Sequence, residues 1–147
     1  MMNLKMIWES EKYKHLRDIF QNKLCFITVS GSWGYGTNVE SSDIDIRGVI
    51  LEDVNNLIGL SDKDVCYTDI ETDTVFYGFN KFVSLLIKQT PSVLELLGCR
   101  EYLVFNEIGQ QLIDSCKMFL SKRCINTFGG YANSILNKEI KRYIKDD

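Results

Sequence analysis

The chain has 147 residues and a mass of 17.0 kDa, with 45% hydrophobic and 25% charged residues, which suits one domain around a single core. A single proline, ten glycines, eight phenylalanines, seven tyrosines and two tryptophans exclude collagenous, low-complexity and disordered chains. No apolar run approaches the roughly 20 residues of a membrane-spanning helix, and charges interrupt the N-terminal segment where an export signal would be apolar. We therefore expect a globular, cytoplasmic protein without membrane contacts.

The formal charge of -3 is unevenly distributed, because residues 1–116 carry -7 and residues 117–147 carry +4. An acidic body with a basic C-terminal segment is typical of cation sites in the body and of a surface for a phosphate-rich partner at the tail. An ordinary solvated helix face gives the same charge pattern.

The residue types that most often hold zinc form no motif here. The five cysteines are odd in number, widely spread and without a C-x-x-C pair, so we expect reduced and mostly buried thiols. His15 is the only histidine and falls in an amphipathic segment, so we assign it no role. The cysteines in question are Cys25, Cys66, Cys99, Cys116 and Cys124.

The N-terminal half predicts a helix and two strands. Ser10 can cap a helix that runs to about Asn22 and presents an apolar face at helical spacing. Residues 24–30 are β-rich, apolar and stopped by a glycine, which predicts a buried strand followed by a polar, glycine-studded turn through residue 42. A second strand is expected from Asp43, so that Asp43 and Asp45 face the same way.

The second half predicts one or two strands over 65–77 and then mostly helices. In that strand segment Asp69, Glu71 and Asp73 share a parity. Thr90 before a proline predicts a helix start, because proline costs little at the first helical position. The remaining expected elements are a helix at about 79–88, a short strand at 101–106, helices at about 107–120 and from 121 onward, and a bend or break at the Gly129-Gly130 pair.

This order of elements predicts one α+β (or α/β) domain, 1–147, with a small mixed sheet covered by helices on one side. Within it we expect a catalytic α/β core over about 1–100 and a helical C-terminal part over about 101–147. No internal repeat or linker divides the chain.

The segment that carries chemistry reads GSWGYGT at 31–37 and SSDIDIRG at 41–48. A strand that ends in Gly-Ser offers backbone N–H groups and a hydroxyl suited to phosphate oxygens. On a strand, residues i and i+2 project to one side, so Asp43 and Asp45 are hard oxygen ligands that can share Mg²⁺ ions. Two such ions, roughly 3.5 to 4 Å apart, clamp a phosphoryl group, which indicates nucleotidyl transfer.

Rival motifs do not fit this segment. A Walker A loop requires Gly-Lys-Ser/Thr, and a dinucleotide-binding turn requires a third glycine where this chain has Asn38 and Val39. An EF-hand loop from Asp43 would put Arg47 at a ligand position and Val54 where a bidentate glutamate is needed.

The segment GSWGYGTNVESSDIDIRG resembles the signature of the DNA polymerase beta superfamily of nucleotidyltransferases, with Gly-Ser at a strand end and Asp-x-Asp on the next strand. More narrowly, it is similar to a family of predicted bacterial and phage nucleotidyltransferases that includes a member associated with RNA repair. The resemblance covers about 24–132, through Asp73-Thr-Val-Phe-Tyr, Pro91-x-x-Leu-Glu-Leu-Leu and Thr127-Phe-x-Gly-Tyr-Ala. Two departures are Thr90, where the family usually has asparagine, and the absence of further C-terminal helices, so the chain is expected to be short relative to the family.

The resemblance implies a role for each matching residue. Asp43, Asp45 and a third carboxylate would hold two Mg²⁺ ions, with Mn²⁺ as the alternative, and carry catalysis. Asp73 is the choice for that third position, and Asp69 or Glu71 are its alternatives. Arg47 would touch nucleotide phosphate or neutralise the carboxylates, and a purely structural ion pair explains it equally well. The implied nucleotide-binding residues are Gly31, Ser32, Tyr35, Gly36, Ser42 and Arg47.

The predicted function is metal-dependent transfer of a nucleoside monophosphate from a nucleoside triphosphate, with ATP favoured, to a hydroxyl, releasing pyrophosphate. RNA ends, protein side chains and small molecules are all candidate acceptors, and the basic tail favours RNA. The alternative is a catalytically incomplete module of the same fold that binds nucleotide or a partner protein. The motifs do not set the oligomeric state.

Overall fold

The computed structural model of the chain describes residues 3–58 and 65–146. Its elements in chain order are α1 (Leu4–Glu9), the 3-10 helix η1 (Glu11–Tyr13), α2 (Lys14–Phe20), β1 (Leu24–Ser30), α3 (Gly31–Tyr35), β2 (Asp45–Ile50), α4 (Val54–Leu57), β3 (Cys66–Asp69), β4 (Thr74–Gly78), α5 (Phe79–Ile87), α6 (Pro91–Leu96), β5 (Tyr102–Val104), α7 (Glu107–Asp114), the 3-10 helix η2 (Cys116–Phe119) and α8 (Arg123–Asp146). The predicted strand at 24–30, the helices at 79–88 and from Pro91, and the short strand within 101–106 are confirmed.

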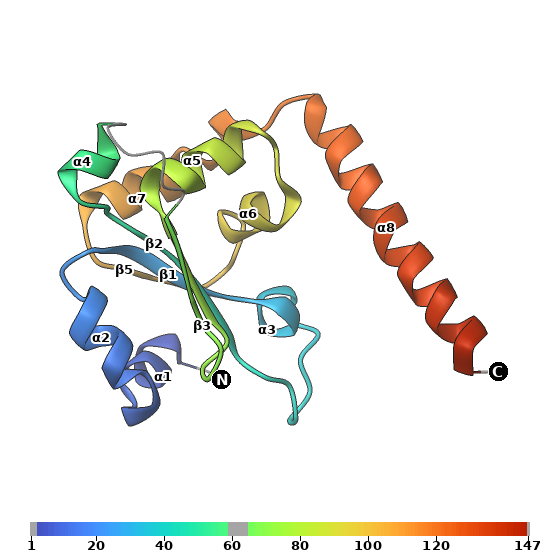
Figure 1. Cartoon of the computed structure of the whole chain (residues 1–147), viewed down its shortest axis with the longest axis horizontal. Coiled ribbons are helices and arrows are strands. Elements are labelled where there is room, and N and C mark those ends of the chain that lie inside the picture. The colour runs from blue at the N-terminus through green and yellow to red at the C-terminus, as the bar shows by residue number, and fades with distance from the viewer. Residues whose placement is uncertain (1–2, 59–64, 147) are drawn as a thin grey trace.

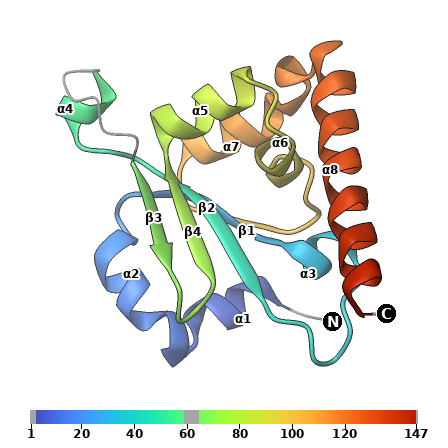
Figure 2. The same cartoon turned by 45° about the vertical axis from the view of Figure 1, so that its right-hand side comes forward.

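The five described strands form one mixed sheet in the order β3-β4-β2-β1-β5. Only the β2–β4 pair is parallel, and the other three pairs are antiparallel. Figure 2 shows the sheet between two groups of helices. The predicted α+β class with a small mixed sheet is therefore confirmed.

Helices cover both faces of the sheet, so the prediction that helices cover one side is wrong. Leu4, Trp8 and Leu16, from α1 and α2, pack with Ile27 and Phe76 on one face. Side chains of α5, α6 and α7 pack on the other face, above the sheet in Figure 1. The physical reason lies in β1, which is apolar at consecutive positions and buried from Leu24 to Val29, as a strand is when both of its faces are covered.

The N-terminal helix is broken at Ser10. Asn3 caps α1, accepting hydrogen bonds from the backbone N–H of Lys5 at 3.0 Å and Met6 at 3.3 Å. Ser10 has extended backbone dihedrals, makes no side-chain cap and separates α1 from η1. The helix predicted to follow Ser10 is confirmed over 11–20, as η1 and α2 in succession, and it ends at Phe20 rather than Asn22.

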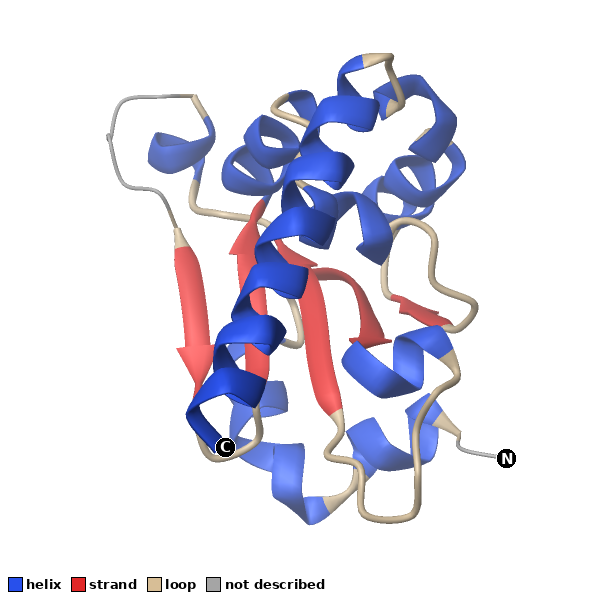
Figure 3. Cartoon of the chain, turned by 90° about the vertical axis from the view of Figure 1, so that its right-hand side faces the viewer, coloured by secondary structure: helices blue, strands red, loops and turns tan. Residues whose placement is uncertain are grey.

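The C-terminal helix α8 is continuous through Gly129 and Gly130, so the predicted bend or break there is wrong. It joins the second core through Cys124 and Phe128, and Figures 1 and 3 show it as one long helix ending at the C-terminus. No helix among the described residues has the length and apolarity to span a membrane. All five cysteines are free, but only Cys25 is buried, so the expectation of mostly buried thiols is wrong: Cys66 is exposed and Cys99, Cys116 and Cys124 are half-buried.

Candidate functional site

Strand register brings the sequence motifs together at one end of the sheet. In the antiparallel β1–β2 pair Ser30 lies opposite Asp45, so Gly31 follows directly beside that carboxylate. In the parallel β2–β4 pair Ile46 lies opposite Thr74, so Asp45 and Asp73 precede matching positions on neighbouring strands. Gly31 and Asp73, more than forty positions apart in sequence, thus both lie beside Asp45 at this end of the sheet.

Gly31 is required by the approach of Asp45. Its φ of +61° is in the left-handed region that side chains other than glycine's disfavour. A Cβ added there would lie 2.3 Å from Asp45 Oδ2, well inside van der Waals contact. The first glycine of the motif therefore makes room for the carboxylate, and this explains why the Gly-Ser turn and the Asp-x-Asp strand occur together.

Asp45, Asp73 and Arg47 form one charged cluster. Arg47 Nη2 lies 3.2 Å from Asp73 Oδ1 and 3.9 Å from Asp45 Oδ1, and Arg47 Nη1 donates to the backbone carbonyl of Asp73 at 2.6 Å. Burial, then a hydrogen bond to the Asp73 carboxylate and its charge, raises the pKa of Asp45 to about 6, against the opposing effect of Arg47. The hydrogen bond from Asp45 and the Arg47 charge lower the pKa of Asp73. Below about pH 6 and without a bound cation, the two carboxyl groups therefore share a proton.

The three candidates for the third carboxylate lie in very different places. Asp69 ends β3, where its Oδ2 accepts from the Thr72 N–H at 3.1 Å and lies 3.3 Å from His15 Nε2. Glu71 is exposed in the turn between β3 and β4. Only Asp73, with a left-handed φ of +48°, reaches Asp45. The hairpin turn breaks the shared parity expected over 69–73, so that part of the prediction is wrong.

Asp43 and Ser42 lie in the loop before β2, which begins at Asp45 rather than at Asp43 as predicted. Asp43 is exposed, and its negative charge is one of the influences that raise the pKa of Asp45. The Ser42 hydroxyl accepts from the Val39 N–H at 2.8 Å and its carbonyl accepts from Trp33 Nε1 at 3.2 Å. These bonds close the loop on itself.

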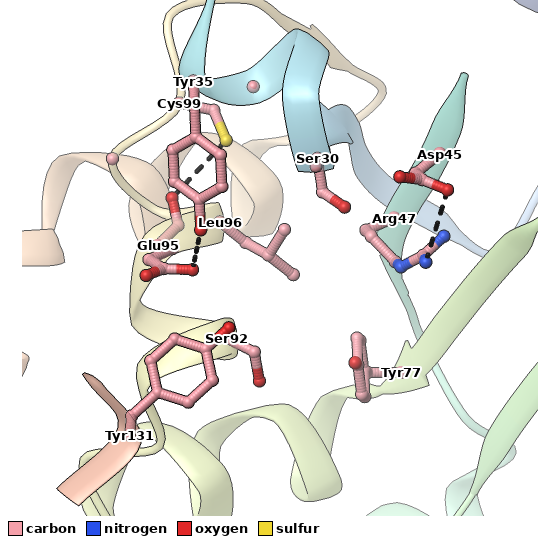
Figure 4. A pocket seen from close by; sticks show the side chains of 13 residues that line it. Ser30, Tyr35, Asp45, Arg47, Tyr77, Ser92, Glu95, Leu96, Cys99 and Tyr131 are labelled. Atoms are coloured by element: carbon pink, nitrogen blue, oxygen red, sulfur yellow. Dashed lines mark hydrogen bonds and ion pairs between the residues drawn. The ribbon is translucent and has the colours of Figure 1, made fainter. Parts of the chain in front are cut away.

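A cavity of about 510 Å³ opens beside the cluster, between α3, α6 and α8 (Figure 4). This volume is in the range of small-molecule sites. Four of the sequence-predicted residues line it, namely Gly31, Tyr35, Asp45 and Arg47. The lining set does not include Ser32, Gly36, Ser42, Asp43 or Asp73.

Several lining residues were not among the predicted site residues. They include Ser30, Tyr77, Ser92, Glu95, Cys99 and Tyr131. Tyr35 Oη donates to Glu95 Oε2 at 2.5 Å, which joins α3 to α6 across the cavity wall. Burial, then this hydrogen bond, raises the pKa of Tyr35. The available signals were the three downstream segments of the resemblance, which contain Tyr77, Glu95 and Tyr131; in the second of them Ser92 and Glu95 are three residues apart on one helix face.

A family model described as the RNA repair pathway DNA polymerase beta family (RlaP) matches residues 2–147. The chain belongs to this family. The resemblance inferred over residues 24–132 is thereby confirmed and extended to both ends. Comparison with curated proteins and with solved structures found no match.

In this polymerase beta family member, the donor set at the sheet edge suits a hard divalent cation. Asp45 and Asp73 offer carboxylate oxygens in mutual contact, and a cation between them would replace the shared proton. Over residues 3–58 and 65–146, no three acidic, histidine or cysteine side chains stand close enough to form a complete metal cluster. Asp43 and the phosphate oxygens of a bound nucleotide are the groups that would complete the coordination.

Proposed function

We propose that this chain is a metal-dependent nucleotidyltransferase, which moves a nucleoside monophosphate from a triphosphate, with ATP favoured, to the hydroxyl of an RNA end. Pyrophosphate is the leaving group. The observation that carries the proposal is the contact of Asp45 with Gly31 and Asp73 at one sheet end, beside a nucleotide-sized cavity. Membership of an RNA repair family supports RNA as the acceptor.

Each residue has a role that follows from its position. Asp45, with its side chain 24% exposed, faces the cavity and would bind cations that also contact the triphosphate. Asp73, with its side chain 59% exposed, lies on the solvent side of Asp45, where it would orient an incoming hydroxyl and accept its proton. Bound Mg²⁺ or Mn²⁺ would activate that hydroxyl and neutralise the departing pyrophosphate.

Arg47 and the Gly31 turn would act on the phosphates. The guanidinium is a bidentate donor that borders the cavity, so it would bind a phosphate oxygen once a cation neutralises the carboxylates. Gly31 has no side chain, so it lets the Asp45 carboxylate lie against the turn, where a cation bound to it would also contact the phosphates. The reacting groups would then lie at the adjoining ends of β1, β2 and β4 and in the turns that lead into β2 and β4.

One observation favours the alternative, a module that binds nucleotide without turnover. Arg47 already offsets part of the negative charge of the Asp45–Asp73 pair, so the two carboxylates can lie together without a metal ion. Such a module would bind a triphosphate with or without Mg²⁺ and transfer nothing.

The experiment is a transfer assay with α-³²P-labelled ATP and a short RNA, paired with calorimetric titration of ATP with and without Mg²⁺. We expect the double variant Asp43→Ala, Asp45→Ala to lose metal-dependent binding and transfer. Cys66→Ser, an exposed change on β3, should retain both. Equal activity of the double variant and the parent would refute the metal site, and metal-independent binding without transfer would establish the module.

A further inference from the structure

We propose that Ser92 and Glu95 on α6 select adenine as the base of the nucleotide bound in the cavity. This inference rests on the proposed function, in which ATP is favoured, and assigns the residues that would recognise the base. Its structural basis is the side of the cavity opposite Asp45 and Arg47. Tyr35, Glu95 and Tyr131 lie on that side (Figure 4).

The cavity has two chemically different ends. Asp45 and Arg47 provide charged groups suited to cations and phosphate at one end. At the other end the lining is uncharged apart from Glu95 and is rich in aromatic and apolar groups, with Leu96 between them. A nucleotide has the same polarity, with phosphates at one end and a flat, weakly polar base at the other.

The edge of α6 presents one acceptor and one donor side by side. An ionised Glu95 carboxylate only accepts hydrogen bonds, and Tyr35 occupies its Oε2, so Oε1 is the atom that remains for a ligand. The Ser92 hydroxyl, one helical turn earlier on the same face and exposed, donates as well as accepts. The pair therefore offers an acceptor from Glu95 and a donor from Ser92.

Among the purine bases, adenine is the one whose edge matches this pair, and cytosine presents the same donor and acceptor on a smaller ring. Its exocyclic amino group at N6 donates and its neighbouring ring nitrogen N1 accepts. Hypoxanthine has the same shape but the reverse pattern, with an oxygen acceptor at position 6 and a donor at N1. A Glu95 carboxylate facing that oxygen would leave two acceptors opposed, and a buried unmatched acceptor is costly.

Aromatic side chains supply the contacts that do not depend on base identity. Tyr131 from α8, 41% exposed, borders this end of the cavity with Tyr35, and Tyr77 from β4 lies nearer to Arg47 (Figure 4). Base–aromatic stacking is tolerant of sequence because every base has a π-face. Stacking thus provides affinity for any base, and Ser92 and Glu95 provide the discrimination.

The test is calorimetric titration of the full chain with ATP, ITP and GTP in the presence of Mg²⁺. The amino group of adenine would donate to Glu95, whereas the oxygen at position 6 of hypoxanthine would face the same carboxylate as a second acceptor. We therefore expect ATP to bind at least about tenfold more tightly than ITP. Glu95→Gln, whose amide can donate to the oxygen at position 6, should bring the ATP-to-ITP ratio close to one. Glu107→Gln, the same exchange at an exposed position on α7, should leave the ratio unchanged.

The outcomes separate this inference from the proposed function. No Mg²⁺-dependent binding of any triphosphate would overturn both. Binding without preference for ATP over ITP, or tighter binding of GTP, would overturn adenine selection alone. Equal weakening of ATP and ITP in Glu95→Gln would assign Glu95 to the sugar and also overturn it. Ser92→Ala, at an exposed position, gives a second reading if Glu95→Gln does not fold, with a smaller loss of ATP preference expected.

Discussion

Replacing Gly31 with alanine tests whether this residue exists to admit the Asp45 carboxylate. The left-handed φ of +61° costs an L-residue about 1–2 kcal/mol. The new Cβ, 2.3 Å from Asp45 Oδ2 but 3.4 Å from its Cγ, would be relieved by rotating the carboxylate. That rotation gives up the hydrogen bond to Asp73, so the clash adds about 1–2 kcal/mol.

The matched control for stability is Gly36→Ala. Gly36 has a similar φ of +72°, but a Cβ there would meet nothing within 4 Å. Urea unfolding should therefore show Gly31→Ala to be about 1–2 kcal/mol less stable than Gly36→Ala, because backbone strain is common to both. Equal unfolding free energies would refute the steric argument.

The functional loss in Gly31→Ala should exceed the loss of stability. A carboxylate displaced by about 1 Å costs on the order of a hundredfold in rate when it positions reacting groups. Calorimetry with ATP and Mg²⁺, and the transfer assay, should show this loss in folded protein while Cys66→Ser behaves as the parent. If Gly31→Ala bound and transferred ATP as the parent does, the position of the Asp45 carboxylate against Gly31 would not matter for function, and the reasoning would be refuted.

Two further predictions concern pH and salt. Because the fold raises the pKa of Asp45 to about 6, protonation of Asp45 stabilises the folded state. This stabilisation is fully present below pH 4 and is lost as pH rises through 6. In metal-free buffer the parent should lose about 1 kcal/mol relative to Asp45→Asn between pH 4 and 7, allowing for solvent screening; urea midpoints that stay parallel would contradict this. Replacing Lys138, Lys141 and Arg142 on α8 with glutamine should reduce the logarithmic salt dependence of single-stranded RNA binding by about 2, and an unchanged slope would exclude this helix from the RNA interface.

Local patterns predicted the elements whose evidence is contiguous in sequence. The apolar run at 24–30 and the glycine that ends it define β1, although the first part of the predicted turn forms the short helix α3. The same run also contained the signal for two covered faces, since Cys25 and Phe26 are as buried as Ile27. An alternating strand would have indicated one solvated face, and this strand does not alternate.

The position of the third carboxylate depended on a turn that strand parity cannot describe. Asp69 bonds to Thr72, the Thr72 hydroxyl lies 2.8 Å from that of Thr74, and the chain reverses between β3 and β4. This leaves Asp73 in a left-handed conformation, in which its backbone carbonyl and carboxylate both contact Arg47. The prediction counted alternate positions as if residues 69–73 were one continuous strand, and it therefore placed Asp69, Glu71 and Asp73 on the same face.

The Asp45–Asp73–Arg47 cluster explains how two adjacent carboxylates remain in a folded chain before substrate binds. Arg47 bridges two strands by bonding the backbone carbonyls of Ile46 and Asp73, so it holds the parallel β2–β4 pair together at the end where the carboxylates meet. If Mg²⁺ releases the guanidinium toward phosphate, the backbone bonds of Nη1 must break as well. Binding of the metal and of the triphosphate is therefore expected to be cooperative. The metal takes the place of Arg47 at the carboxylates, and the triphosphate provides a new partner for the released guanidinium.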